Sequence, residues 1–188
     1  VISHPDEVDA LDLPDPDKAA YITQTTLSVD DTREIIAALR RRFPKIIGPS
    51  KDDICYATQN RQAAVKTVAE EVDVVLVIGA ANSSNANRLR EVSETTGSLA
   101  YLINDVRDIK PGWLEGATRL GITAGASTPE FLVREAVEAL RRMDDVKVRE
   151  VHVVDEDVRF GVPHELEGIA QETGRTLPPR ATATSQQR

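Results

Sequence analysis

Short runs of hydroxyl and amide side chains recur along this chain of 188 residues and are well suited to bind an anion. They occupy residues 23–28, 82–85 and 123–127. Each run follows an expected strand and precedes an expected helix, where free backbone N–H groups favour phosphate. In a parallel α/β sheet such turns meet at the carboxyl ends of the strands. Together the three runs would suit a phosphate or a diphosphate.

Helix capping is the alternative explanation for the same side chains. Ser, Thr and Asn are common N-cap residues, and one of them is enough to cap a helix. Asn82, Ser83, Ser84 and Asn85 stand in a row, which exceeds what a cap requires. Gly125 in the third run would allow close backbone approach to a ligand, but it would equally suit a plain turn. Capping and anion binding both remain open for each run.

Cys55 is the only cysteine of the chain. It lies directly before an expected helix, where a thiolate is stabilised, and its neighbours Asp52 and Asp53 are charged. A buried structural thiol and a metal-ligating or reactive thiolate are both open, because no second ligand lies at metal-binding spacing. A single cysteine excludes an internal disulfide framework, so we expect a reducing, cytoplasmic location.

Composition excludes several classes of partner. The formal net charge is -8 and the pI is about 5.0, without a dense Lys/Arg cluster, so we expect no nucleic acid partner. No apolar run is long enough to span a bilayer and no secretory signal is present, so we expect no membrane association. The chain begins at Val1 and its only methionine is Met143, which favours a fragment of a longer protein.

Alternating helical and β-branched patterns predict a parallel α/β sheet that would position these residues. The continuous apolar run at 73–79 is typical of a strand buried on both faces. Ser28 is expected to cap the first long helix. The expected strands are 20–23, 73–79, 99–103 and 119–123, and the expected helices are 29–43, 58–72, 84–96 and 129–142, with a short helical piece around Trp113. Later in the chain we expect strands at 146–154 and 158–160 and a helix within 163–172.

Six segments in unbroken order resemble the LytB family of 4-hydroxy-3-methylbut-2-enyl diphosphate reductases. The resemblance covers roughly residues 20–166, and motifs of this length and order are highly specific. The segments are TQTTLSVDDT at 23–32, FPKIIGP at 43–49, KDDICYATQNRQ at 51–62, NSSN at 82–85 with NRL at 87–89, TAGAS at 123–127 and FGVP at 160–163.

The resemblance implies a trefoil of three α/β domains around a [4Fe-4S] cluster held by three cysteines. The fourth iron would be open to the substrate hydroxyl, where it would act as a Lewis acid. The implied reaction removes that hydroxyl with two electrons and two protons. It yields isopentenyl and dimethylallyl diphosphates in the non-mevalonate (MEP) isoprenoid pathway. An electron donor such as ferredoxin or flavodoxin is implied as a partner.

The resemblance also implies roles for individual residues. Cys55 matches the third cluster cysteine of the family. Thr25 matches the threonine that hydrogen-bonds the substrate hydroxyl and helps to relay protons. The residues that match those holding the diphosphate are Ser83, Ser84, Asn85 and Ser127.

The family's other two cluster cysteines, its substrate-binding histidines and its proton-donating glutamate have no counterpart here. We therefore expect the C-terminal part of the enzyme, inactive alone. The expected divisions are the end of the second domain at 1–50, the third domain at 51–143, closing strands and a helix at 144–173, and a disordered tail at 174–188. The alternative is a cluster-free α/β module that binds a diphosphate or a protein partner.

Overall fold

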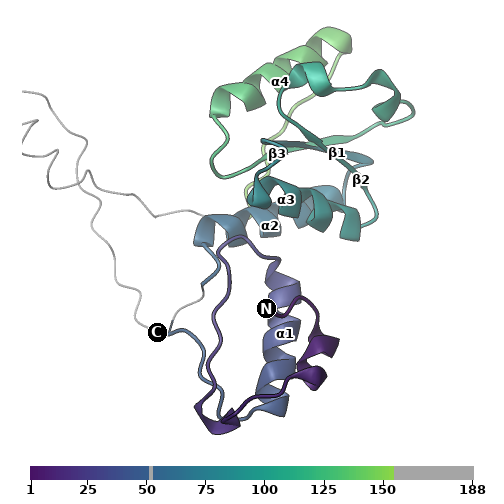
Figure 1. Cartoon of the computed structure of the whole chain (residues 1–188). Helices are drawn as coiled ribbons and strands as arrows, with labels where there is room; N and C mark the ends of the chain where they lie inside the picture. The colour runs from purple at the N-terminus through teal and green to yellow at the C-terminus, as the bar shows by residue number, and fades with distance from the viewer. Residues whose placement is uncertain (51–52, 155–188) are drawn as a thin grey trace, which may run out of the picture. The chain divides into compact units, whose positions relative to one another are not determined.

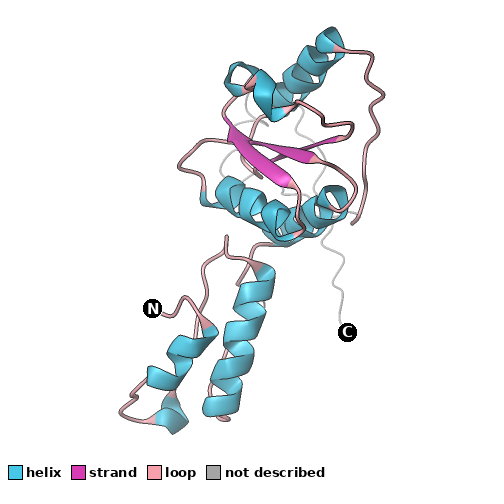
Figure 2. Ribbon diagram, turned by 90° about the vertical axis from the view of Figure 1, so that its right-hand side faces the viewer, coloured by secondary structure: helices cyan, strands magenta, loops and turns pink. Residues whose placement is uncertain are grey.

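Three parallel strands form the sheet at the centre of this fold. The structure is a computed structural model that describes residues 1–50 and 53–154. Within these residues β1 (Val74–Ile78) lies between β2 (Leu99–Ile103) and β3 (Leu120–Ala124), and all pairings are parallel (Figure 2). The sheet and its helices confirm the predicted α/β class.

Helices cover both faces of the sheet (Figure 1). On one face α2 (Tyr56–Ala69) and α3 (Ser84–Thr95) pack against Val75 and Val77 of β1. On the other face α4 (Glu130–Met143) packs against the alternate β1 side chains, including Leu76. Successive strand residues point to opposite faces, so a strand covered on both sides must be apolar throughout. This is why every residue of β1 is buried.

Local sequence explains how closely α2 approaches the sheet. Gly121 of β3 faces α2, and a Cβ atom at this position would lie only 2.6 Å from Cγ1 of Val68. The absence of a side chain at Gly121 therefore lets α2 pack directly over β3. Gly79, at the end of β1, plays the same part for α3, since a Cβ atom there would lie 2.5 Å from Cβ of Ala86.

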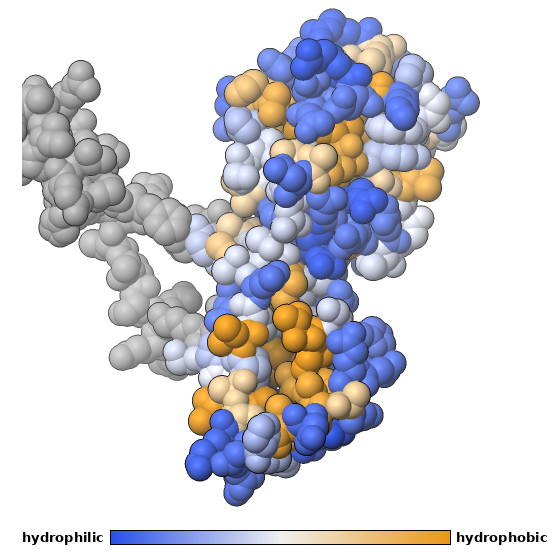
Figure 3. All heavy atoms as spheres, in the orientation of Figure 1, coloured by the Kyte–Doolittle hydropathy of each residue, from blue (hydrophilic) through white to orange (hydrophobic). Residues whose placement is uncertain are grey.

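Residues 1–50 have an apolar core of their own around α1 (Val29–Arg42). The 3-10 helices η1 (Pro5–Ala10) and η2 (Pro16–Lys18) precede α1, and Val8, Leu39 and Phe43 are buried together. Ser28 caps α1 as predicted, because its Oγ accepts a hydrogen bond from the Asp31 amide at 3.3 Å. Figure 3 shows apolar atoms gathered on the surface of this part of the chain; its residues Ile22 and Ile47 are exposed.

Two predicted strands are wrong. Residues 20–23 form only an isolated bridge, in which Ala20 pairs with Ile47. Residues 146–154 include no strand, and most of them are exposed. Both segments have the β-branched composition of strands, but a strand also needs a neighbour to complete its hydrogen bonds. The predictions for 158–160, 163–172 and 174–188 lie outside the described residues.

The remaining elements agree with the sequence to within a few residues. The short helical piece around Trp113 is η4 (Pro111–Trp113), which follows η3 (Val106–Asp108). The largest boundary difference is in α2, which begins at Tyr56 and ends at Ala69 rather than covering 58–72. No helix in the described part of the chain combines the length and apolar character that crossing a membrane requires.

Asp73 ties the three strands together at the end where they begin. Its Oδ2 accepts hydrogen bonds from the Thr118 amide at 2.8 Å, the Thr118 hydroxyl at 3.1 Å and the Arg119 amide at 3.0 Å. Its backbone N–H donates to Arg119, and its carbonyl accepts from Leu99. The hydrogen bonds from the two amides, followed by that from the hydroxyl, lower the pKa of the Asp73 carboxyl below its usual value of 3.8.

We predict that Asp73→Asn lowers the urea midpoint at neutral pH by an amount that shrinks on acidification. A carboxylate with a lowered pKa stabilises the folded state above its ordinary pKa, and this contribution is lost as the pH falls through the folded-state pKa. Urea unfolding of both proteins, in steps from neutral pH to about pH 3, measures the difference. Asp145→Asn, at an exposed carboxylate, serves as the control. A gap that stays constant with pH would contradict the prediction.

Candidate functional site

A crevice is expected between the carboxyl ends of β1 and β3. From β1 the chain enters α3 on one face of the sheet, whereas from β3 it enters α4 on the opposite face. Adjacent strands whose connections leave in opposite directions open a crevice at their carboxyl ends, where ligands of α/β proteins bind. The polar runs at 82–85 and 123–127 follow these two strands, so the topology brings them to the same edge.

The two turns at this edge contact each other closely. The amide of Gly125 donates to the carbonyl of Ile78 at 2.9 Å, and the Thr128 hydroxyl donates to the same carbonyl at 3.0 Å. A Cβ atom at Gly125 would lie 3.5 Å from Cβ of Ala86 and 3.8 Å from Nδ2 of Asn85. The first turn of α3 therefore lies directly against the turn that follows β3.

Asn85 is the residue of this edge whose polar groups are left without partners. Its side chain is 8% exposed, and neither Nδ2 nor Oδ1 has a hydrogen-bond partner in the described part of the chain. Ser83 differs, because its Oγ caps α3 by accepting from the Ala86 amide at 3.3 Å. Asn87 also has partners, since its Nδ2 donates to the carbonyl of Ala81 at 2.8 Å. Capping thus accounts for Ser83 but not for Asn85.

Unpaired buried polar groups are uncommon and costly. Most buried polar atoms in folded proteins have a hydrogen-bond partner, and leaving one unpaired costs about 1–3 kcal/mol. The Asn85 amide offers both a donor and an acceptor beside the N-terminus of α3. It is therefore suited to a ligand that supplies polar oxygen atoms.

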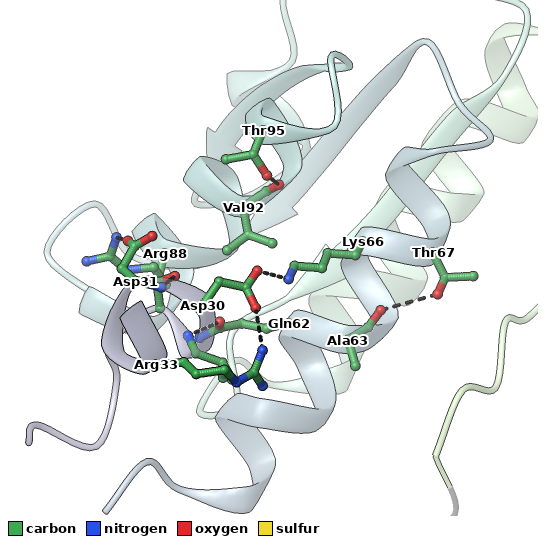
Figure 4. Close-up of polar contacts among 12 residues, drawn as sticks. Asp30, Asp31, Arg33, Gln62, Ala63, Lys66, Thr67, Arg88, Val92 and Thr95 are labelled. Atoms are coloured by element: carbon green, nitrogen blue, oxygen red, sulfur yellow. Dashed lines mark hydrogen bonds and ion pairs between the residues drawn. The ribbon is translucent and has the colours of Figure 1, made fainter. Parts of the chain in front are cut away.

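Gln62 of α2 holds the first polar run in place (Figure 4). The side chain is 2% exposed; its Oε1 accepts from the Val29 amide at 2.9 Å and its Nε2 donates to the Leu27 carbonyl at 2.8 Å. The ion pair of Lys66 with Asp30 reinforces this contact. One buried amide thus satisfies backbone groups on both sides of the N-cap of α1.

This attachment places the first polar run beside the second across a polar groove of about 300 Å³. Arg88 of α3 lies in the groove, with Nη1 3.7 Å from Asp31 and 2.7 Å from Glu91. The lining residues are Gln24, Thr26, Leu27, Ala81, Asn82, Ser84, Asn87, Arg88 and Glu91. Of the six predicted site residues, Ser84 lines this groove. The run at 123–127 instead contacts the second run at the carboxyl edge of the sheet, and Ser127 is exposed.

Thr25 and Cys55 lie next to each other, although 30 residues separate them in the sequence. The Cys55 amide donates to the Thr25 carbonyl at 3.1 Å, and the Thr23 amide donates to Oδ2 of Asp53 at 2.7 Å. Cys55 is the N-cap residue of α2, and its thiol makes no capping hydrogen bond. Both Thr25 and Cys55 are exposed, so a buried structural thiol is excluded.

The described residues hold no complete metal site of their own. Across 1–50 and 53–154, no group of three His, Cys, Asp or Glu side chains is arranged to hold a metal ion. Cys55, the predicted metal ligand, therefore belongs to no group of three such side chains within these residues.

Sequence reasoning missed two residues of α2 that contact the polar runs. Gln62 occupies the buried face of α2 together with Thr58 and Val65. A long polar side chain on the buried face of a helix indicates a buried hydrogen bond, so this residue could have been predicted from the sequence. Its neighbour Arg61 donates from Nη1 to the Ala124 carbonyl at 3.1 Å. No local pattern marks Arg61, because its contact lies 63 residues away.

The fold and its polar residues define a parallel α/β protein with neutral hydrogen-bonding side chains at the carboxyl edge of the sheet and an exposed thiol at the start of α2. The chain belongs to the LytB family, since the sequence model of the family described as LytB protein matches residues 1–141.

Curated relatives agree with this membership. The chain is 55% identical over 161 residues to the 4-hydroxy-3-methylbut-2-enyl diphosphate reductase of Azoarcus sp. (strain BH72), covering 86% of this chain and 52% of that protein. It is 52% identical over 170 residues to the enzyme of the same name from Methylibium petroleiphilum, covering 88% and 52%. The chain therefore spans about half the length of the curated relatives it matches.

A solved structure agrees as well. The E-1-hydroxy-2-methyl-but-2-enyl-4-diphosphate reductase from Plasmodium falciparum superposes with a TM-score of 0.83 at 31% identity. The match covers 93% of this chain and 55% of that protein. The resemblance found in the sequence motifs is thus confirmed in sequence and in fold.

We predict that Gln62→Met destabilises the chain and releases the first turn of α1. The substitution keeps the length of the side chain but leaves the part-buried Val29 amide and Leu27 carbonyl unpaired, at a total cost of about 1–3 kcal/mol. Urea unfolding measures the loss, and hydrogen exchange at Val29 reports the local release. Gln59→Met, which removes one bond to the Ile54 carbonyl, is the matched control and should cost less. Unchanged protection at Val29 would refute the role of Gln62.

Proposed function

We propose that this chain forms the diphosphate-binding part of a 4-hydroxy-3-methylbut-2-enyl diphosphate reductase. Membership of the LytB family and the names of the curated relatives support this function. The observation that carries the proposal is the buried Asn85 amide, whose two polar atoms have no partner among the described residues. The proposed reaction removes the substrate hydroxyl as water with two electrons and two protons, and yields isopentenyl and dimethylallyl diphosphates.

The diphosphate would be bound by Ser83, Ser84, Asn85 and Ser127. Nδ2 of Asn85 donates to a phosphate oxygen, and the exposed hydroxyls of Ser84 and Ser127 donate from the two turns. The amides of Ser84 and Asn85 belong to the first turn of α3, where N–H groups have no acceptor within the helix. Such amides favour an anion, so the backbone strengthens the same site.

Thr25 and Cys55 would act at the other end of the substrate. Thr25 lies next to Cys55, so its hydroxyl would donate to the substrate hydroxyl and relay a proton toward the departing oxygen. The exposed Cys55 thiol at the start of α2 fits a thiolate ligand of an iron–sulfur cluster, because a helix N-terminus stabilises the thiolate. When bound, the cluster supplies electrons and a Lewis-acidic iron. Ferredoxin or flavodoxin would deliver those electrons.

The chain does not fit the whole cluster, because it contains one cysteine where three are implied. The remaining thiolates would have to come from residues beyond these 188. This mismatch favours a second candidate function, a cluster-free module that binds a diphosphate through the same crevice.

Reconstitution of the chain separates the two candidates. We predict that anaerobic treatment with iron and sulfide produces neither the broad visible absorbance of a cluster nor substrate turnover, since one thiolate cannot retain the iron. A longer chain that adds the two further cysteines, the substrate-binding histidines and the glutamate of the family should gain both the absorbance and the turnover. Turnover by the 188-residue chain alone would refute the prediction.

We predict that Asn85→Leu weakens pyrophosphate binding and stabilises the free chain. Leucine has the same branched arrangement of side-chain heavy atoms and removes the unpaired polar atoms, so stability should rise by about 1–3 kcal/mol, while the affinity should fall at least about tenfold. Calorimetric titration with pyrophosphate and thermal unfolding measure the two effects. Asn104→Leu, which alters an exposed asparagine after β2, is the control. Equal pyrophosphate affinity in Asn85→Leu and the wild type would refute the proposed site.

A further inference from the structure

The exposed Ser127 hydroxyl of the proposed diphosphate site lies in a turn that begins at a glycine. A glycine has more backbone freedom than any other residue, so Gly125 by itself would leave this turn loose. We propose that Thr128 is a positioning residue of the site, because its side chain fixes the turn against β1 and so places the Ser127 hydroxyl. The inference rests on the proposed function of the carboxyl edge of the sheet.

Residues 125–128 form a β-turn. The Thr128 amide donates to the Gly125 carbonyl at 2.9 Å, which is the hydrogen bond between the first and fourth residues that is typical of such a turn. Ala126 and Ser127 are its two central residues, and both are exposed. The direction of the Ser127 side chain therefore depends on how the two ends of the turn are held.

Both ends of the turn are bound to one carbonyl group of the central strand. The Gly125 amide donates to the Ile78 carbonyl at 2.9 Å, and the Thr128 hydroxyl donates to the same oxygen at 3.0 Å. With the Gly125 bond alone, rotation about the glycine backbone could swing Ser127 away from β1. The bond from Thr128 holds the second end of the turn and restricts this motion.

Two glycines make room for the Thr128 hydroxyl. A Cβ atom at Gly125 would lie 3.1 Å from Oγ1 of Thr128, and a Cβ atom at Gly79 would lie 3.6 Å from the same oxygen. The first distance is shorter than an ordinary van der Waals contact, so the glycine that loosens the turn also lets the hydroxyl reach β1. Threonine is branched at Cβ and stiff at χ1, so its hydroxyl keeps this direction.

Asn87 holds the turn after β1 in a different way. The Ser83 amide donates to the Ala80 carbonyl at 2.8 Å. Nδ2 of Asn87 donates to the carbonyls of Ala81 and Ser83 at 2.8 and 3.0 Å. These contacts are local and fix the shape of their own turn. The Thr128 bond instead fixes the turn after β3 relative to the strand that leads into the other turn, and turns ordered in advance lower the entropic cost of binding.

The test measures pyrophosphate binding to the 188-residue chain by calorimetric titration. Thr128→Val keeps the shape of the side chain but removes the hydroxyl, and we expect it to weaken binding about fivefold by loosening the turn. Thr128→Ser keeps the hydroxyl and should recover most of the affinity. The matched control is Thr95→Val, which removes a hydroxyl that donates to the Val92 carbonyl at 2.7 Å near the C-terminal end of α3. Thermal unfolding checks that each variant is folded, and Thr128→Ala replaces Thr128→Val if the valine variant does not fold.

A double-mutant cycle tests whether Thr128 acts through Ser127. We expect Ser127→Ala alone to weaken pyrophosphate binding about tenfold. In the Ser127→Ala background, Thr128→Val should add a loss of less than about twofold, because the turn then carries no hydroxyl to position. A purely structural role of Thr128 would give the same loss in both backgrounds, and that result would refute the inference.

The outcomes separate this inference from the proposed function. If Asn85→Leu and Ser127→Ala lose affinity but Thr128→Val binds pyrophosphate like the wild type, the inference is wrong and the proposed site stands. Equal losses in Thr128→Val and Thr128→Ser, or an equal loss in Thr95→Val, also refute the inference. Unchanged binding in Ser127→Ala refutes it as well, because Thr128 then has no ligand group to position. A wild-type chain that binds no pyrophosphate refutes the proposed site and the inference together.

Discussion

The contacts of one buried amide organise the polar surface of this protein. Gln62 joins α2 to the backbone on both sides of the N-cap of α1, and its two partners lie 33 and 35 residues away. Together with the hydrogen bonds that join Thr25 to Cys55 and Thr23 to Asp53, this contact fixes the position of the run at 23–28. With it, Thr25 lies beside Cys55, and Gln24 and Thr26 line the same groove as Ser84. Gln62 is buried and each of its two polar side-chain atoms has a partner, so the contact also stabilises the fold.

Stability and ligand binding make opposite demands at the carboxyl edge of the sheet. The edge is built on β1, a strand buried on both faces, and on close packing at Gly79 and Gly121. Beside this rigid base, Asn85 and Arg61 keep buried polar atoms that have no partner among residues 1–50 and 53–154. Apolar side chains there would be better for the isolated fold. Sites that break a local rule of stability in this way are characteristic of binding surfaces.

The core of the fold could be predicted from sequence because its signals are local. A β-branched run at 73–79 can be buried only as a central strand, and the caps Ser28 and Ser83 start helices within three residues of themselves. The errors at 20–23 and 146–154 have one cause, since a strand depends on a neighbour that its own residues do not specify. The contacts of Gln62 and Arg61 could not be predicted for a related reason, because their partners lie far away in the sequence.

The sequence by itself determined the α/β class, the order of the elements and, through long ordered motifs, membership of the LytB family. It also marked the hydroxyl and amide runs as candidates for anion binding. Only the tertiary structure decided which of those residues caps a helix and which keeps unpaired polar atoms. Ser83 and Asn85 are equally good caps by residue type, yet Ser83 caps α3 while Asn85 is buried and has no partner in the described part of the chain. Whether a polar atom is satisfied depends on what the whole fold packs around it, and no local pattern contains that information.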